Sequence, residues 1–84
     1  MKNMSKDEIL INLSSIINEV IDASFTFSGA DKIADIDGLD SIAMIQILSS
    51  IKSKFGVSLA VSEIVSLKTL NDLVDCIAFS LGEK

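Results

Sequence analysis

Histidine, arginine, proline, tryptophan and tyrosine are all absent from this chain of 84 residues. Without histidine, the chain has no ordinary general base near pH 7 and no imidazole ligand for a metal ion. All seven basic residues are lysine, so no guanidinium is present to hold a phosphate or carboxylate through two parallel hydrogen bonds. These absences argue against an enzyme and against a metal site.

Positive charge is also scarce. Twelve acidic residues against seven lysines give a net charge of −5, which disfavours binding to nucleic-acid phosphates. The single cysteine, Cys76, cannot form a disulfide within the chain. Residues 1–8 lack the apolar core of a signal peptide, and no apolar run approaches membrane-spanning length. We therefore expect a cytoplasmic, monomeric protein that binds neither nucleic acid nor membrane.

The residues that are present favour helices. Hydrophobic residues make up 49% of the chain and aromatic residues only 5%, so isoleucine, leucine, valine, alanine and methionine must build the core. Capping-box spacings at Ser5 with Glu8 and at Thr69 with Asp72 predict two helix starts. Ser62 is expected to cap a short helix, and Gly56 and Gly82 are expected to end the helices before them. Helical periodicity predicts helices over residues 5–24, 41–55, 62–66 and 70–81.

These four segments predict an all-α fold in one domain, residues 1–84. Each helix carries one apolar stripe, and a small four-helix bundle of three main helices plus a short third one buries all of them. Between the first two helices the helical period is lost over a loop of about 15 residues, a length that is often functional. Ile33, Ile36 and Leu39 are spaced as anchors that hold this loop on the core.

The loop ends at Asp40 and Ser41, either of which can cap the second helix. With no histidine to activate it, an exposed serine at a helix start is a poor nucleophile and a good acceptor for a group that another protein attaches. Ile42 falls on the polar side of the helix beside Ser41, and Ile45 lies at the margin of the apolar stripe.

The segment Gly38-Leu39-Asp40-Ser41-Ile42, placed between a long loop and a helix that ends in Phe55-Gly56-Val57, resembles the acyl carrier proteins and peptidyl carriers. The resemblance covers residues 5–81. It implies that a phosphopantetheinyl transferase attaches 4'-phosphopantetheine to Ser41, and that the arm carries an acyl or aminoacyl group as a thioester. It further implies that Asp40 helps to position the transferase and its metal ion.

The same resemblance implies two apolar surfaces. Ile42 and Ile45 are expected to contact the transferase and the acyl- or aminoacyl-loading and condensing enzymes. The acyl pocket is expected between the second and third helices, with the candidate lining residues Ile45, Leu48, Leu59 and Ile64.

One departure from the fatty-acid carriers concerns charge. Residues 25–41 hold four aspartates and one lysine, a net charge of −3, whereas residues 42–58 hold two lysines and no acid. Helix two of fatty-acid carriers is typically acidic and docks on basic partner surfaces. Because charge complementarity governs partner choice, we expect a carrier of a specialised polyketide, peptide or dedicated acyl pathway.

Other interpretations of the same residues are weaker. An EF-hand register with Gly38 at its sixth position places Ile33 and Met44 where acids are required, so calcium binding is excluded. An unmodified helical interaction module, with Ser41 phosphorylated or left free, stays open as the alternative. The sequence assigns no role to Cys76 or Phe79.

Overall fold

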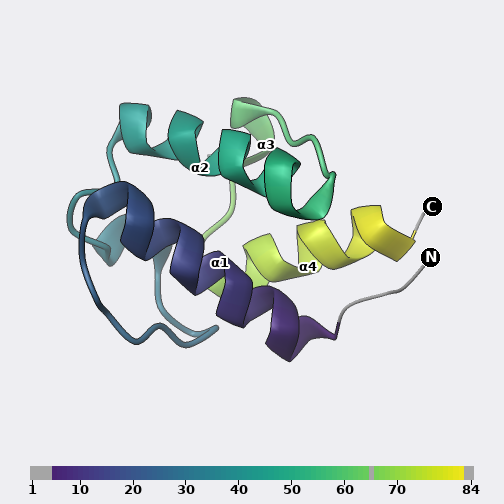
Figure 1. Ribbon diagram of the computed structural model, residues 1–84, viewed down its shortest axis with the longest axis horizontal. Coiled ribbons are helices and arrows are strands. Elements are labelled where there is room, and N and C mark those ends of the chain that lie inside the picture. The colour runs from purple at the N-terminus through teal and green to yellow at the C-terminus, as the bar shows by residue number, and fades with distance from the viewer. Residues whose placement is uncertain (1–4, 65, 83–84) are drawn as a thin grey trace.

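The computed structural model describes residues 5–64 and 66–82. Four α-helices and one short 3-10 helix follow one another along this part of the chain, with no strand among the described residues (Figure 1). The expected all-α, four-helix architecture is confirmed. None of these helices combines the length and apolarity needed to cross a membrane. The elements are α1 (Lys6–Ile21), η1 (Ile33–Asp35), α2 (Ser41–Phe55), α3 (Val61–Ile64) and α4 (Leu70–Gly82).

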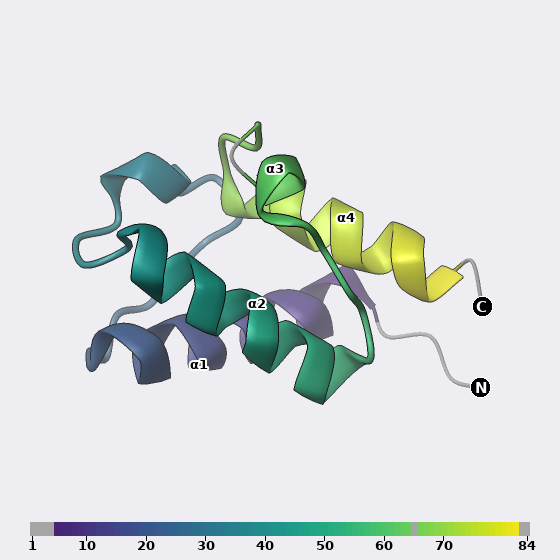
Figure 2. The ribbon, with the colours of Figure 1, turned by 90° about the horizontal axis from the view of Figure 1, so that it is seen from above.

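Helix α1 lies at the centre of the packing. It contacts both α2 and α4, while α3 packs against α2 (Figure 2). Four side chains of the α1 apolar stripe, Ile9, Leu13, Ile16 and Ile17, are buried by these neighbours, and burial of each such side chain contributes about 1.5–3 kcal/mol. No buried polar side chain interrupts the core in the described part of the chain. The buried side chains are Ile9, Leu13, Ile16, Ile17, Ile33, Ala43, Ile47, Ile51, Phe55, Val57, Ile64, Leu70, Leu73, Val74 and Ile77.

Helix α1 begins as the sequence indicates and ends earlier. The Glu8 N–H donates to the Ser5 hydroxyl at 3.1 Å and the Ser5 N–H donates to Glu8 Oε1 at 3.0 Å, which completes the capping box. The prediction of a helix through residue 24 is wrong, because Asp22 adopts a left-handed conformation with φ 56° and stops the helix at Ile21.

Helix α2 has the bounds expected from its pattern. It begins at Ser41 and ends at Phe55, and Gly56 follows with φ 71° as the left-handed stop. Lys52 and Lys54 occupy its last turn, where positive charge suits the negative end of the helix dipole.

The short helix α3 begins one residue before the predicted start and ends at Ile64. Ser62 lies inside it and is therefore not its cap; the Ala60 N–H before the helix donates to Glu63 Oε1 at 2.8 Å. Residue 65, within the predicted range, lies outside the described residues.

Helix α4 follows a complete capping box. The Asp72 N–H donates to Thr69 Oγ1 at 3.3 Å and the Thr69 N–H donates to Asp72 Oδ2 at 3.1 Å. Helix α4 includes Gly82, one residue beyond its predicted last residue. The residues after Gly82 lie outside the described part.

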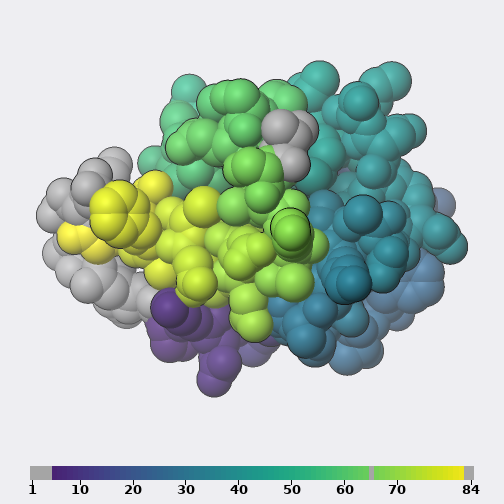
Figure 3. Space-filling model, turned by 180° about the vertical axis from the view of Figure 1, so that it is seen from behind, coloured from purple at the N-terminus to yellow at the C-terminus, as the bar shows by residue number. Residues whose placement is uncertain are grey.

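The long loop between α1 and α2 is attached to the start of α4. The Ile33 N–H donates to the Lys68 carbonyl at 2.8 Å, and the Leu70 N–H donates to the Asp31 carbonyl at 3.0 Å. These bonds frame an isolated antiparallel bridge between Lys32 and Thr69. Figure 3 shows the two segments side by side on the back of the molecule. Ile33 is buried and Ile36 and Leu39 pack against the core, so the three expected anchors are confirmed.

Candidate functional site

Ser41 is the first residue of α2 and is exposed to solvent. Asp40 is the N-cap: its Oδ1 accepts the Ala43 N–H at 2.8 Å, and its carbonyl accepts the Met44 N–H at 2.9 Å. This settles which of the two candidate residues caps the helix. Among the described residues, no hydrogen bond engages the Ser41 hydroxyl or the N–H groups of Ser41 and Ile42. The serine oxygen therefore stands free at the positive end of a helix.

Gly38 sets the direction from which the chain reaches Ser41. Its φ is +90°, a conformation that side chains rarely adopt. A Cβ at this position would lie 3.3 Å from Cβ of Ile21, the last residue of α1. The turn at Gly38 therefore packs directly against the end of α1, and this contact helps to position the start of α2.

Asn18 holds the other end of the loop. Its side-chain Nδ2 donates to the Phe25 carbonyl at 2.9 Å, and its Oδ1 accepts the Phe25 N–H at 2.9 Å. The side chain of Asn18 thus pairs with both backbone polar groups of Phe25, as a neighbouring strand would. Helical periodicity places Asn18 only on the polar side of α1, so sequence analysis missed this role.

Two exposed isoleucines follow Ser41 in the first turns of α2. Ile42 is 69% exposed and Ile45 is 57% exposed, so Ile42 lies outside the core as its position on the helix predicts. An isolated exposed isoleucine is ordinary. Two of them within the first turns of α2 make an apolar surface beside an exposed hydroxyl.

An apolar pocket of about 390 Å³ opens between η1, the first turns of α2 and α3. Of the four residues expected to line an acyl pocket, only Ile64 belongs to its wall, and it is 2% exposed. Leu48 and Leu59 are half-buried against the core and Ile45 faces solvent. The wall consists of Lys32, Ile33, Ala34, Met44, Ile64, Leu67 and Lys68.

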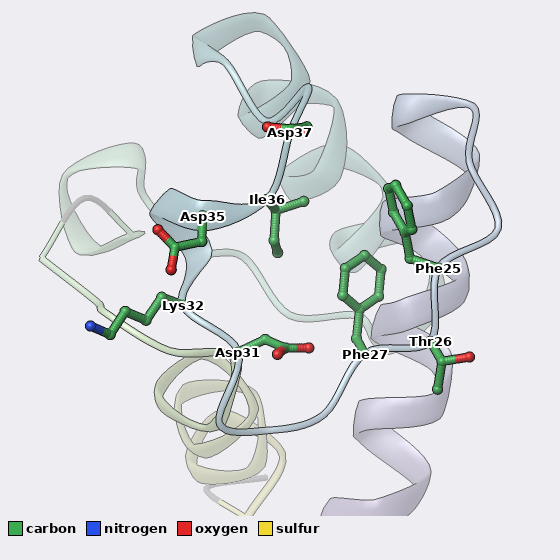
Figure 4. A pocket seen from close by; sticks show the side chains of 8 residues that line it. All are labelled: Phe25, Thr26, Phe27, Asp31, Lys32, Asp35, Ile36 and Asp37. Carbon is green, nitrogen blue, oxygen red and sulfur yellow. The ribbon is translucent and has the colours of Figure 1, made fainter.

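A second pocket, of about 330 Å³, lies within the long loop (Figure 4). Figure 4 shows Phe27 and Ile36 facing its middle, while Lys32 points away from the aromatic rings. The rings of Phe25 and Phe27 meet edge to face with their centroids 6.0 Å apart. Asp31, Asp35 and Asp37 make the rest of the wall largely polar.

Two titratable side chains on α4 have shifted pKa values. Hydrogen bonds from the Lys68 and Thr69 N–H groups lower the pKa of Asp72. Burial, followed by the nearby charges of Glu63, Asp72 and Asp75, raises the pKa of the Cys76 thiol. Cys76 therefore stays protonated near neutral pH and is a weak nucleophile.

Comparison with known proteins gives a consistent result. Residues 13–77 match the protein family described as "Phosphopantetheine attachment site". The chain is 39% identical over 77 residues to the acyl carrier protein of Acidothermus cellulolyticus, covering 89% of this chain and 90% of that protein. It is 39% identical over 75 residues to the acyl carrier protein of Myxococcus xanthus, covering 87% of this chain and 94% of that protein.

Proposed function

Because this chain belongs to the acyl carrier protein family, we propose that it carries acyl groups as thioesters on a 4'-phosphopantetheine arm bound to Ser41. Members of this family are carriers that serve other enzymes and are not enzymes themselves. The observation that carries the assignment to Ser41 is its free, exposed hydroxyl at the first position of α2.

The residues around Ser41 suit a phosphodiester. The N–H groups of Ser41 and Ile42 have no partner in the described part, and helix N-termini favour added phosphate. In the attachment reaction, the Ser41 oxygen forms a bond to the phosphorus of the phosphopantetheine in coenzyme A. The nucleotide part of coenzyme A leaves, and the hydroxyl proton passes to the transferase. We assign the base to the transferase, because this chain has no histidine to act near pH 7.

The bound arm supplies a thiol on which an acyl or aminoacyl group is held as a thioester. This chain contributes the apolar pocket, whose wall includes Met44, one helical turn beyond Ser41. The chemistry belongs to the partner enzymes.

Ile42 and Ile45 form the surface that we assign to partner contact, and Asp40 is the residue that we assign to transferase recognition. An apolar side chain beside the attachment point can be buried by a transferase without loss of any hydrogen bond. The partners are a phosphopantetheinyl transferase and acyl- or aminoacyl-loading and condensing enzymes.

The charge of α2 supports partner enzymes of a specialised pathway. Gln46, Ser49 and Ser53 are exposed on α2, and the helix contains no acid. A partner that recognises carriers through a basic patch finds no complementary charge here. We therefore assign the chain to a dedicated acyl, polyketide or peptide pathway in preference to general fatty-acid synthesis.

This assignment predicts poor turnover with the standard fatty-acid synthesis enzymes. Loss of electrostatic steering lowers association rates by roughly tenfold or more at low salt. The triple variant Gln46→Glu, Ser49→Glu, Ser53→Glu should recover much of that loss. Loading and elongation rates of the unaltered chain that equal those of an ordinary acidic carrier would contradict the assignment.

The test of the proposed function is intact-mass spectrometry after co-expression with a broad-specificity phosphopantetheinyl transferase. We expect one added phosphopantetheine on the unaltered protein and none on Ser41→Ala. Ser53→Ala, which alters an exposed serine on the same helix, is the control and should be modified fully. No addition with several transferases would instead favour the unmodified interaction module.

A further inference from the structure

The apolar pocket beside α2 carries two lysines on its wall. Its other wall residues, including the buried Ile33 and Ile64, are all apolar. Its volume of about 390 Å³ is near the lower end of the range for small-molecule sites, roughly 300–1,000 Å³. The pocket is thus apolar inside, small, and positively charged where Lys32 and Lys68 line it.

The two lysines come from segments that are fixed to each other. The Ile33 N–H donates to the Lys68 carbonyl at 2.8 Å, and Lys32 pairs with Thr69 in the isolated bridge. Both lysines therefore line the same pocket as Met44, the wall residue that lies one turn from Ser41.

Neither lysine is neutralised by an ion pair within the described residues, whereas Lys6 pairs with Asp75 at 2.9 Å. The nearest acid along the chain from Lys68, Asp72, uses its carboxylate to accept the N–H groups of Lys68 and Thr69, and it attracts the Lys68 ammonium without forming an ion pair with it. Both lysines are exposed, so they can pair with an incoming anion without a large desolvation cost.

We infer that the preferred cargo is a short acyl chain that ends in a carboxylate. Its methylene groups would lie against Met44 and Leu67, and its terminal carboxylate would reach Lys32 and Lys68. The inference rests on the proposed function, because the chain must be delivered as a thioester on the arm at Ser41. A neutral chain of the same length fills the same apolar space but forms no ion pair with either ammonium group.

The experiment compares two six-carbon cargoes that differ only at the far end. A broad-specificity transferase loads the protein from hexanoyl- or adipoyl-coenzyme A, and intact mass follows thioester cleavage by hydroxylamine. Each rate is divided by that of the free acyl-coenzyme A, which removes intrinsic reactivity. Because a single exposed ion pair stabilises modestly, we expect the adipoyl form to be protected about two- to fivefold more than the hexanoyl form at low salt.

Charge variants identify the groups responsible. Lys32→Gln with Lys68→Gln should abolish the difference between the two cargoes. Lys52→Gln with Lys54→Gln, the same charge change at the far end of α2, should preserve it. Equal protection of both cargoes, or a difference that survives loss of Lys32 and Lys68, would overturn the inference. Failure to load either cargo would contradict the proposed function instead, so the two failures are distinguishable.

Discussion

At the residue scale, Asp40 caps α2, whereas the Ser41 hydroxyl has no hydrogen bond among the described residues. Asp40 Oδ1 accepts the Ala43 N–H at 2.8 Å, so one carboxylate oxygen is committed to capping α2. The residue is exposed, so its negative charge stays accessible to a partner. Substitution can therefore separate the capping role of Asp40 from the recognition role that we propose for it.

We predict that Asp40→Ala lowers the free energy of unfolding by about 1 kcal/mol, because Ala cannot cap a helix. Asp40→Asn should stay within about 0.5 kcal/mol, since Asn is an equally good N-cap. Urea unfolding followed by circular dichroism measures both. If Asp40 also guides the transferase, Asp40→Asn is modified slowly although it is fully folded; normal modification of this variant would limit Asp40 to capping.

Gly38 is the second residue whose identity the backbone requires. We predict that Gly38→Ala destabilises the fold by about 1–2 kcal/mol through its positive φ, plus the cost of displacing Ile21. Gly56→Ala is the matched control, because Gly56 has φ +71° but no atom lies within 4 Å of the point that a Cβ would occupy. Gly38→Ala should also slow modification of Ser41, whereas Gly56→Ala should not. Equal effects of both variants on stability and modification would contradict the role of the Ile21 contact.

The attachment motif can be read from the sequence, but its support cannot. The order of residues from Gly38 to Ile42 indicates a loop that ends at a capped helix. The approach of Gly38 to Ile21 and the hold of Asn18 on Phe25 join positions that are not neighbours in the chain, and no local pattern encodes them.

At the element scale, the start of α4 anchors both the helix and the long loop. Asp72 accepts the N–H groups of Lys68 and Thr69, and these bonds lower its pKa. A carboxyl whose pKa is lower in the folded state stabilises the fold above its unfolded pKa of about 3.9. That contribution is lost as the pH falls through the folded-state pKa.

We predict that the unaltered protein loses more stability than Asp72→Asn as the pH falls from about 5 to about 2. At pH 7 the urea midpoint of Asp72→Asn should lie below that of the unaltered protein, and the gap should narrow in acid. Asp37→Asn changes the net charge equally without removing a cap and serves as the control. A gap that is constant with pH would show that the Asp72 charge does not contribute.

Helix boundaries are predictable where a capping box or a glycine marks them. The start of α1, both ends of α2 and the start of α4 carry such signals. Helix α1 instead ends at Ile21, because Asp22, a non-glycine residue, adopts a left-handed conformation. The apolar period predicts a helix that runs three residues further. In α3, the Ala60 N–H before the helix donates to Glu63 Oε1, and Ser62, the expected cap, lies inside the helix.

At the scale of the whole molecule, α1 packs against α2, which begins at Ser41, and against α4, whose start holds the long loop. Its contacts with α2 and α4 fix the frame, and the loop that α4 anchors closes one side of the apolar pocket. Three segments distant in sequence form that pocket, and Leu48 and Leu59, the candidate lining residues of an acyl pocket, are not part of its wall. The surface charge, in contrast, can be predicted from the sequence, because the exposure of a charged side chain does not depend on a packing partner.

The central claim is that Ser41 carries the phosphopantetheine arm, and site-localised mass spectrometry tests it most directly. Trypsin cuts this arginine-free chain only after lysine, so one peptide spans residues 33–52 and contains Ser41, Ser49 and Ser50. Fragmentation of this peptide from the modified protein should place the entire added mass on Ser41. Added mass on Ser49 or Ser50, or an unmodified peptide from protein that carries the group elsewhere, would contradict the account.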